Sequence, residues 1–138
     1  METRNRCYSY FTIVGEFDPD AITERLGIVP FNSFRPGDRR GDGSLHTFSR
    51  WSCGRCDTYE VDTAIQMRKT IAGLLDKVDV LEQIRKDFDV SFYLEVVPML
   101  YGGDTAPGLS PSLDVIDFCH ATRTEIDIDL YVYGPEVA

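Results

Sequence analysis

Long hydrophobic runs are missing from this chain of 138 residues. No apolar stretch approaches the ~20 residues that a helix needs to cross a bilayer, which excludes a helical membrane protein. The opening residues, M-E-T-R-N-R-C-Y, are charged and lack the apolar core of a signal peptide. We therefore expect a cytoplasmic protein without a membrane partner.

Basic residues are also scarce. Lys and Arg number 14 against 23 Asp and Glu, so the net charge is -9 and the isoelectric point is near 4.6. This excess of negative charge disfavours nucleic acid and favours solubility or a basic protein partner. The four cysteines, in a chain without a signal peptide, are expected to be free thiols.

The remaining composition is typical of a soluble globular protein, since 43% of the residues are hydrophobic and 27% are charged. At this length, residues 1–138 are expected to form a single domain with one core. The sequence contains no internal repeat and no low-complexity segment.

The first part of the chain predicts a strand followed by a short helix. Residues 6–16 are rich in aromatic and β-branched side chains, which favour a strand. Asp18 can cap a helix whose first position is Pro19. Phe17 and Ile22 occupy the two positions of a hydrophobic staple at its start.

A turn-rich segment and a second long strand come next. Gly27 suits the left-handed residue that ends the helix. Residues 31–45 contain P-G-D-R-R-G-D-G-S, which predicts turns with room for a short strand at 33–35. Residues 46–53 predict a further strand. Alternation gives it two faces, one with His46 and Phe48 and the other with Thr47, Ser49, Trp51 and Cys53.

The middle of the chain predicts a long helical region. Asp62 is a suitable N-cap, and apolar residues then recur at steps of three and four. The resulting stripe consists of Met67, Ile71, Leu74, Val78, Leu81, Ile84 and Phe88. Gly73 and the D-K-V-D at 76–79 leave room for a break into two helices.

The last third predicts two strands separated by a helix. Residues 90–100 alternate between apolar and polar side chains, as a half-buried strand does. Ser110 can cap a helix that begins at Pro111 and runs toward Arg123 through Leu113, Ile116 and Phe118. Residues 124–133 alternate again. Ile126, Ile128, Leu130 and Val132 are expected to face the core, and Glu125, Asp127, Asp129, Tyr131 and Tyr133 to face outward.

Taken in order, these elements are β-α-β-β-α-β-α-β. Strands with one apolar and one polar face predict an α+β fold. We expect a single, mostly antiparallel sheet of about five strands with helices packed on one face, a two-layer sandwich.

Several of these residues resemble a known family. The run D-P-D-A-I-T-E-R-L-G-I-V-P at 18–30, the G-D at 37–38, Trp51, the long helical middle and the D-I-D-L-Y-V-Y-G at 127–134 together resemble the bacterial domain-of-unknown-function family 4279. The resemblance covers nearly the whole chain. It implies a small cytoplasmic α+β domain, and it supplies no catalytic residues to transfer. The C-G-R-C at 53–56 departs from the family pattern.

Cys53 and Cys56 form a C-x-x-C pair, which can hold half a zinc site or a redox disulfide. A structural zinc needs four ligands, and the remaining candidates, Cys7, Cys119, His46 and His120, are distant in sequence. If the strand continues through Cys56, a separation of three places the two thiols on opposite faces. Free, partly buried thiols are the competing interpretation, and no cofactor is predicted.

Positive charge gathers in residues 31–56. This segment holds Arg35, Arg39, Arg40, Arg50 and Arg55 against Asp38 and Asp42, a net charge of +3 (five minus two). One interpretation is an anion site formed by Arg35, Asp38, Arg39, His46 and Trp51. The other is that Trp51 packs in the core and the arginines pair with acidic residues.

Negative charge gathers on the last strand. Glu125, Asp127 and Asp129 are expected on one face, ~6.5–7 Å apart, where they repel unless cations neutralise them. Arg4, Arg6 or the loop arginines are the expected neighbours. Glu95 is the one further carboxylate that the pattern places near a metal site here.

These observations favour a non-enzymatic binding or protein-interaction module, with an acidic inhibitor or immunity-type protein as one subclass. Its partner would be another protein or a second copy of the chain. The alternative is a small anionic-ligand-binding protein or an enzyme. That alternative requires the residues around Trp51 to converge on one concave pocket.

Overall fold

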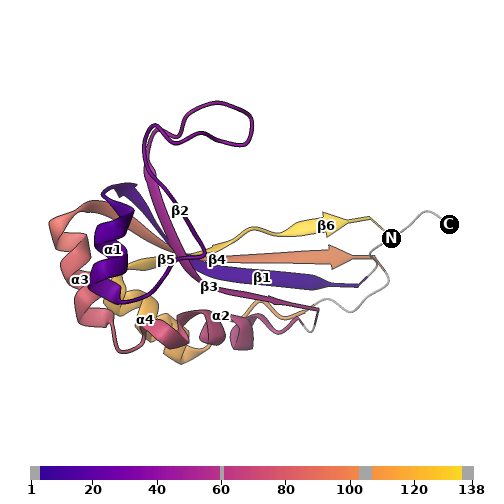
Figure 1. Ribbon diagram of the computed structural model, residues 1–138. Coiled ribbons are helices and arrows are strands. Elements are labelled where there is room, and N and C mark those ends of the chain that lie inside the picture. Colours follow the sequence, from indigo (N-terminus) through magenta and orange to yellow (C-terminus); the bar gives the residue numbers. More distant parts are fainter. Residues whose placement is uncertain (1–3, 60, 103–106, 135–138) are drawn as a thin grey trace.

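A computed structural model describes residues 4–59, 61–102 and 107–134 (Figure 1). Its strands are β1 (Arg6–Glu16), β2 (Asn32–Phe34), β3 (Ser49–Thr58), β4 (Asp89–Tyr101), β5 (Thr124–Ile128) and β6 (Tyr131–Tyr133). Its helices are α1 (Pro19–Leu26), α2 (Thr63–Ile71), the 3-10 turn η1 (Ala72–Leu74), α3 (Val78–Asp87) and α4 (Leu113–Thr122).

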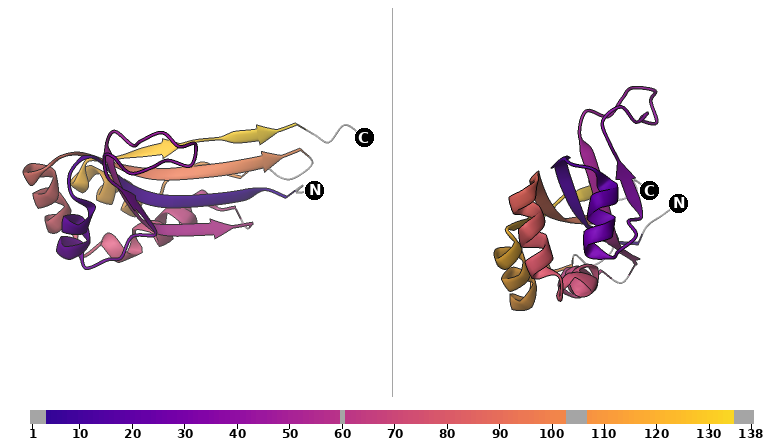
Figure 2. Two further views of the ribbon diagram at one scale, coloured as in Figure 1. Left: turned by 45° about the horizontal axis from the view of Figure 1, so that its top comes forward. Right: turned by 60° about the vertical axis from the view of Figure 1, so that its left-hand side comes forward.

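The strands form one sheet in the order β2-β3-β1-β4-β5, with β6 paired to β4 beyond the end of β5. The pairs β1–β3, β1–β4 and β2–β3 are antiparallel, whereas β5 and β6 run parallel to β4 because α4 crosses over between them. The helices cover one face of the sheet and leave the other uncovered (Figures 1 and 2). The predicted α+β fold with a mostly antiparallel sheet is confirmed.

The first strand and helix agree with the sequence prediction. Asp18 accepts a hydrogen bond from the Asp20 N–H at 2.9 Å, and Pro19 begins the helix. Gly27 ends it in the left-handed region with φ 67°. Ile22 is fully buried beneath the sheet. Local capping chemistry is therefore sufficient to define α1.

The long helical region does break, as Gly73 allowed. Asp62 caps α2 by accepting the Ile65 N–H at 3.2 Å, and η1 then turns the chain into α3. The predicted apolar stripe is confirmed as core. Met67, Ile71, Leu74, Leu81 and Ile84 are buried, and Val78 and Phe88 pack against them.

The predicted start of α4 was wrong. The N-cap is Ser112, not Ser110, so the helix begins at Leu113. Leu113 and Ile116 are 77% and 43% exposed. The buried side consists of Val115, Phe118, Cys119 and Thr122. Phe118 sets this orientation, because its ring lies 6.4 Å from that of Phe11 in the core.

The last strand is also divided, not continuous as predicted. It breaks after Ile128, where the Asp129 N–H donates to the Val96 carbonyl at 2.8 Å. Leu130 and Val132, expected in the core, are 44% and 69% exposed. The reason is that β6 extends past the end of the helical layer (Figure 1), so none of the described helices covers it there.

Strand β3 occupies residues 49–58, later than the predicted 46–53. Residues 35–48 instead form an ordered hairpin that projects from the sheet, which we call the arm. The Gly37 N–H donates to the His46 carbonyl at 2.9 Å, and the Arg40 N–H donates to the Ser44 carbonyl at 2.7 Å. The arm rises on the side of the sheet opposite α2 and α4 (Figure 1).

Candidate functional site

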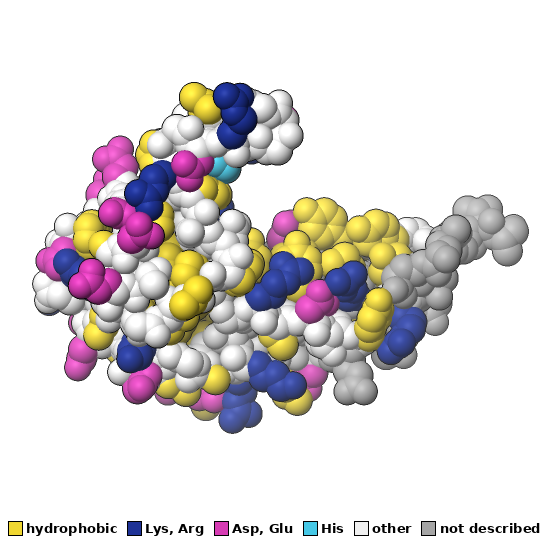
Figure 3. All heavy atoms as spheres, in the orientation of Figure 1, with side chains coloured by type: hydrophobic (Ala, Val, Ile, Leu, Met, Phe, Trp, Pro, Cys, Tyr) yellow, Lys and Arg dark blue, Asp and Glu magenta, His cyan; other side chains and the backbone are white. Residues whose placement is uncertain are grey.

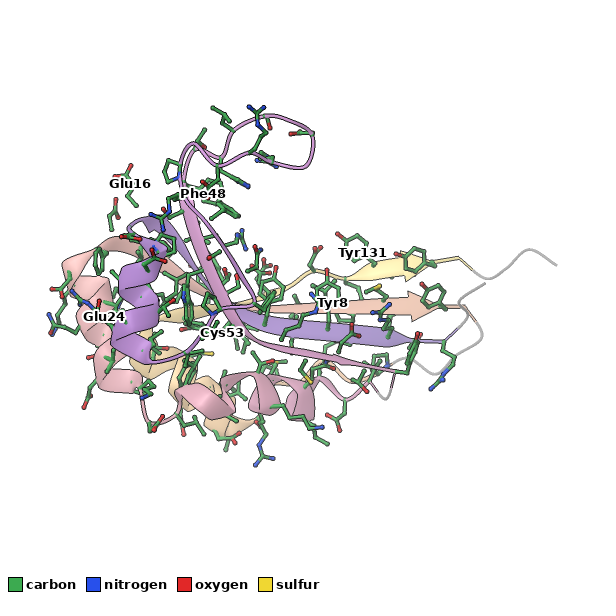
Figure 4. The ribbon with its side chains drawn as sticks, in the orientation of Figure 1. Tyr8, Glu16, Glu24, Phe48, Cys53 and Tyr131 are labelled. Atoms are coloured by element: carbon green, nitrogen blue, oxygen red, sulfur yellow. The ribbon has the colours of Figure 1, made fainter. Side chains whose placement is uncertain are left out.

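The open face is the side of the sheet that the helices leave uncovered. Alternation from the buried Phe11, Phe92 and Leu94, together with the cross-strand pairs, assigns residues to it. They include Arg6, Tyr8, Tyr10, Thr12, Arg50, Ser52, Arg55, Asp57, Tyr93, Glu95, Met99, Tyr101, Asp127, Tyr131 and Tyr133. Figure 4 shows Tyr8 and Tyr131 on this side, with Cys53 directed to the helices.

Tyrosine dominates the open face. Of the chain's seven tyrosines, all but Tyr59 lie on it, so many of its rings also carry hydroxyl groups. Tyr8 stacks on Tyr10 with ring centroids 6.3 Å apart, and Tyr101 stacks on Tyr133 at 4.6 Å. Tyr131 and Tyr133 are 46% and 43% exposed.

The arm gives the open face a wall at one end. Its base is an aromatic cluster in which His46 stacks on Phe34 with centroids 3.5 Å apart, and Phe48 meets Phe34 edge-on at 5.4 Å. Figure 3 shows the arm overhanging a hollow, beyond which hydrophobic side chains gather over β6 and the adjoining end of β4. The open face is therefore concave.

Two acidic side chains lie side by side near the centre of the open face. Glu95 and Asp127 lie opposite each other on β4 and β5. Burial, a hydrogen bond to Asp127 and the Asp127 charge raise the pKa of Glu95 to about 7, with a further contribution from Asp129. Arg50 opposes this rise. Burial and the neighbouring Glu95 in turn raise the pKa of Tyr10.

The two sides of the open face differ in charge: arginines neutralise the acid on the β3 side, and among the described residues acidic side chains remain unpaired on the β5 side. On the β3 side, the Arg6 guanidinium lies 2.7 Å from Asp57 and that of Arg55 lies 3.5 Å from it, which holds the pKa of Asp57 below its usual range. Arg55 also lies over the Tyr8 ring, 4.4 Å from its centroid. The acid on this side is thus neutralised.

The β5 side keeps its negative charge. Among the residues that the structure describes, no Lys or Arg lies within ion-pair distance of Glu125, Asp127 or Asp129. The expected neutralisation by arginines was wrong, and three of the arginines expected there have other partners. Arg4 lies over the Tyr59 ring, Arg6 holds Asp57, and Arg35 pairs with Asp18 and Asp20.

Of the residues predicted to form an anion site, Arg35, Asp38 and His46 lie together in the arm, where the His46 N–H donates to the Asp38 carbonyl at 2.9 Å, but Trp51 does not join them. Arg35 Nη2 lies 3.2 Å from both Asp18 and Asp20, and the Asp38 carboxylate accepts the Arg35 N–H at 2.9 Å. Arg39 is exposed on the arm, bridged to Leu45. His46 stays at the base of the arm against Phe34.

Trp51 lies on the opposite face of the sheet from the arm. It is completely buried, and its Nε1–H donates to Thr23 Oγ1 of α1 at 3.0 Å. It packs in the core and offers no stacking surface to a ligand held by the arginines. The structure thus supplies the arrangement of the competing interpretation, a packed Trp51 and a paired Arg35.

Cys53 and Cys56 share a face, and the expectation of opposite faces was wrong. Phe11 pairs with Cys53, and Ser9 pairs with Cys56. Strand β3 therefore has one residue more than β1 between these two pairs. Gly54, with φ 72°, forms this bulge. Both thiols are free. No three His, Cys, Asp or Glu side chains within residues 4–59, 61–102 and 107–134 are placed to share a metal ion.

Sequence reasoning found parts of the open face without its extent. The outward positions of Glu125, Asp127, Tyr131 and Tyr133 came from alternation, and Glu95 was placed near them. The same alternation along β1 puts Arg6, Tyr8, Tyr10 and Thr12 on one side. No single element showed that all four helices would pack on the opposite side of the sheet.

The fold and this surface define a class: small α+β proteins whose single sheet is covered by helices on one face and is bare on the other. Residues 5–133 match the family described as Domain of unknown function (DUF4279), and the chain belongs to that family. No curated protein and no solved structure matches the chain. Among the described helices, none has the length and apolar content needed to span a membrane.

Proposed function

We propose that this protein is a protein-interaction module that binds a basic segment of a partner protein on its open face. The observation that carries the proposal is the bare, concave, tyrosine-rich surface between the arm and β6. An acidic inhibitor or immunity-type protein is the subclass that this chemistry fits best.

The composition of the open face supports binding to another protein. Tyrosine and arginine are enriched at the centres of protein interfaces, where rigid rings supply area at little entropic cost. Tyr8, Arg55 and Tyr10 form such a set, since the two rings stack and the guanidinium covers one of them. A sheet face that only meets solvent usually carries polar side chains instead.

The charge of the open face supports a basic partner. Burial and the neighbouring Asp127 raise the pKa of Glu95, because the described residues supply no cation that neutralises the pair fully. A Lys or Arg of a partner would supply that cation, and the net charge of -9 would steer it toward the protein. The acidic β5 side then receives the cation while the tyrosines pack against its neighbours.

An unbiased selection of displayed random peptides tests this proposal. We expect selected peptides to be rich in Lys and Arg. Tyr8→Ala and Tyr131→Ala should each weaken their binding by about tenfold or more, as removal of a central interface tyrosine does. Ile116→Ala on α4, a matched exposed apolar residue outside the open face, should leave the affinity unchanged.

Two outcomes would overturn the proposal. The first is a set of selected peptides whose affinity responds to Ile116→Ala and not to the tyrosine variants. The second is a wild-type protein that sediments as a dimer and becomes a monomer with Tyr131→Ala. In that case a second copy occupies the open face, not a basic partner.

A further inference from the structure

Strand β5 is one margin of the sheet. The strand order ends there, and in the part of the chain that the structure describes no strand pairs with its outer side. In Figure 2 (left), the yellow strands β5 and β6 form that margin. A free strand edge presents unpaired N–H and C=O groups, to which the backbone of another chain can bond. The function proposed above uses the open face and not this edge.

The hydrogen bonds to β4 show which groups of β5 face outward. Strand β5 runs parallel to β4, and just beyond its end the Asp129 N–H donates to the Val96 carbonyl at 2.8 Å. Because the backbone groups of successive strand residues point to opposite sides, those of Asp127 also face β4. The N–H and C=O groups of Ile126 and Ile128 therefore face the free edge.

A cavity of about 710 Å³ lies beside this edge. Thr124, Glu125 and Ile126 line it, and the side chains of successive strand residues point to opposite faces. The cavity therefore reaches the edge of the strand and not only one of its faces. Its other wall includes Ile116 and His120, which lie one turn apart on α4.

The charges along β5 favour a basic segment at this edge. Glu125 and Asp127 lie on the open-face side of the strand, and among the described residues neither has a Lys or Arg within ion-pair distance. Two copies of this chain paired edge to edge would bring these carboxylates together, and like charges opposite one another destabilise a sheet. A strand with Lys or Arg at alternate positions would instead supply the missing cations.

The other side of the same strand favours apolar residues. Ile126 points away from the open face and is half-buried. Ile116 of α4 is 43% exposed on the opposite wall of the cavity. Apolar side chains that enter between them would remove this surface from water. Glu82 and Arg123, also on the wall, carry opposite charges and together add no net charge.

We propose that the free edge of β5 binds an extended segment of another protein in which basic and apolar residues alternate, added to the sheet as a further strand. The backbone of the segment bonds to the outward groups of Ile126 and Ile128. Its basic side chains lie beside Glu125 and Asp127, and its apolar side chains enter the cavity. This site requires neither the arm nor the tyrosines, so it is independent of the function proposed above.

Binding of the peptide acetyl-K-V-K-V-K-V-K-amide, measured by isothermal titration, tests this proposal. We expect it to bind at least about tenfold more tightly than acetyl-K-K-K-K-V-V-V-amide, which has the same charge but cannot alternate across a strand. Ile116→Ala and Glu125→Gln should each weaken binding by about threefold or more. Val29→Ala and Glu24→Gln, at exposed positions in and after α1, are the matched controls and should leave it unchanged.

N-methylated forms of the alternating peptide test the backbone contact. Methylation of the valines removes the N–H groups on one side of the extended peptide, and methylation of the lysines removes those on the other. One form should bind about tenfold or more weakly and the other should change by less than about twofold. The sensitive residues are the valines for an antiparallel added strand and the lysines for a parallel one.

Three results would overturn the proposal. The first is an alternating peptide that does not bind, or that binds no better than the block peptide. The second is an equal effect of the two methylations. The third is an affinity that responds to Tyr8→Ala and not to Ile116→Ala, which would place the peptide on the open face and leave the function proposed above standing.

Discussion

Glu95 is the residue whose ionisation controls the charge of the open face. Its pKa rises from an ordinary 4.5 to about 7, so the folded protein holds this proton more tightly than the unfolded chain does. The resulting stability is fully present below about pH 4.5 and is lost as the pH rises through about 7. Glu95 therefore destabilises the protein at alkaline pH.

Glu95→Gln should remove that penalty. The amide keeps the shape of the side chain, donates to Asp127 and carries no charge. We expect it to raise the stability at pH 8 by on the order of 1 kcal/mol after allowance for solvent screening, with little change at pH 4.5. Urea denaturation at both pH values measures this. Glu125→Gln is the control, and equal pH profiles for Glu95→Gln and the wild type would contradict the assignment.

At the scale of single residues, prediction from the sequence succeeded where the alternation of side chains along a strand was unbroken. The burial of Trp51 and the separation of Phe48 from it agree with the two-residue period of a strand. Cys56 could not be placed in this way, because the bulge at Gly54 inserts one residue and reverses the parity of the later positions in β3. The close approach of α2 that favours a bulge there depends on tertiary packing.

The bulge in strand β3 depends on Gly54. Its φ of 72° favours glycine, and an added Cβ would lie 2.4 Å from the Thr70 carbonyl oxygen in α2. Gly54→Ala should therefore lower the free energy of unfolding by roughly 2 kcal/mol or more, because the new side chain strains the backbone at positive φ and also clashes with the α2 backbone. Chemical denaturation measures this loss.

Gly73→Ala is the control for this substitution. Gly73 lies in η1 with no heavy atom within 4 Å of an added Cβ. Alanine is favoured over glycine in helical segments, so Gly73→Ala should leave the stability unchanged or slightly higher. Equal losses for Gly54→Ala and Gly73→Ala would show that the bulge does not need glycine.

Elements with local signals were the ones that sequence predicted well. Helix α1 has a cap, a proline and a terminal glycine within ten residues, and α2 and α3 have a long 3.6-residue stripe. The start of helix α4 and the outer half of the last strand were misread, and both elements have apolar residues on more than one side. Which side is buried depends there on Phe11 and on where the helical layer ends.

At the scale of the whole molecule, the charge of the open face should make partner binding depend on pH. A partner cation beside Glu95 favours its ionised form, so binding releases the proton that Glu95 holds. The charges that face Glu95 are Asp127 and Asp129 from the β5 side and Arg50 from β3, with Tyr10 of β1 opposite. Affinity for a selected basic peptide should therefore rise between pH 6 and pH 8.

Isothermal titration in two buffers of different protonation enthalpy measures this proton release. We expect release of about half a proton per molecule at pH 7 in the wild type, because Glu95 is half protonated there, and none with Glu95→Gln. An affinity that falls as the pH rises would contradict this account. A wild-type and Glu95→Gln pair with the same pH dependence would do so as well.

The bare sheet face is a property of the whole molecule, and this limits what the sequence could predict. Each strand showed one polar side, which is what a solvated sheet requires. Only the assembled sheet shows that the tyrosines of β1, β4 and β6 are adjacent and that the arm encloses them. Six strands contribute to this surface, so no short sequence motif corresponds to it.

The most direct test of the central claim is a chemical-shift map of the labelled protein with a selected basic peptide. We predict that the largest perturbations fall on the amides of β1, β4 and β6 around Tyr8, Tyr10 and Tyr131, with smaller changes along the arm. Perturbations concentrated on α2 and α4, with β1 and β6 unchanged, would contradict it and would assign binding to the helical side.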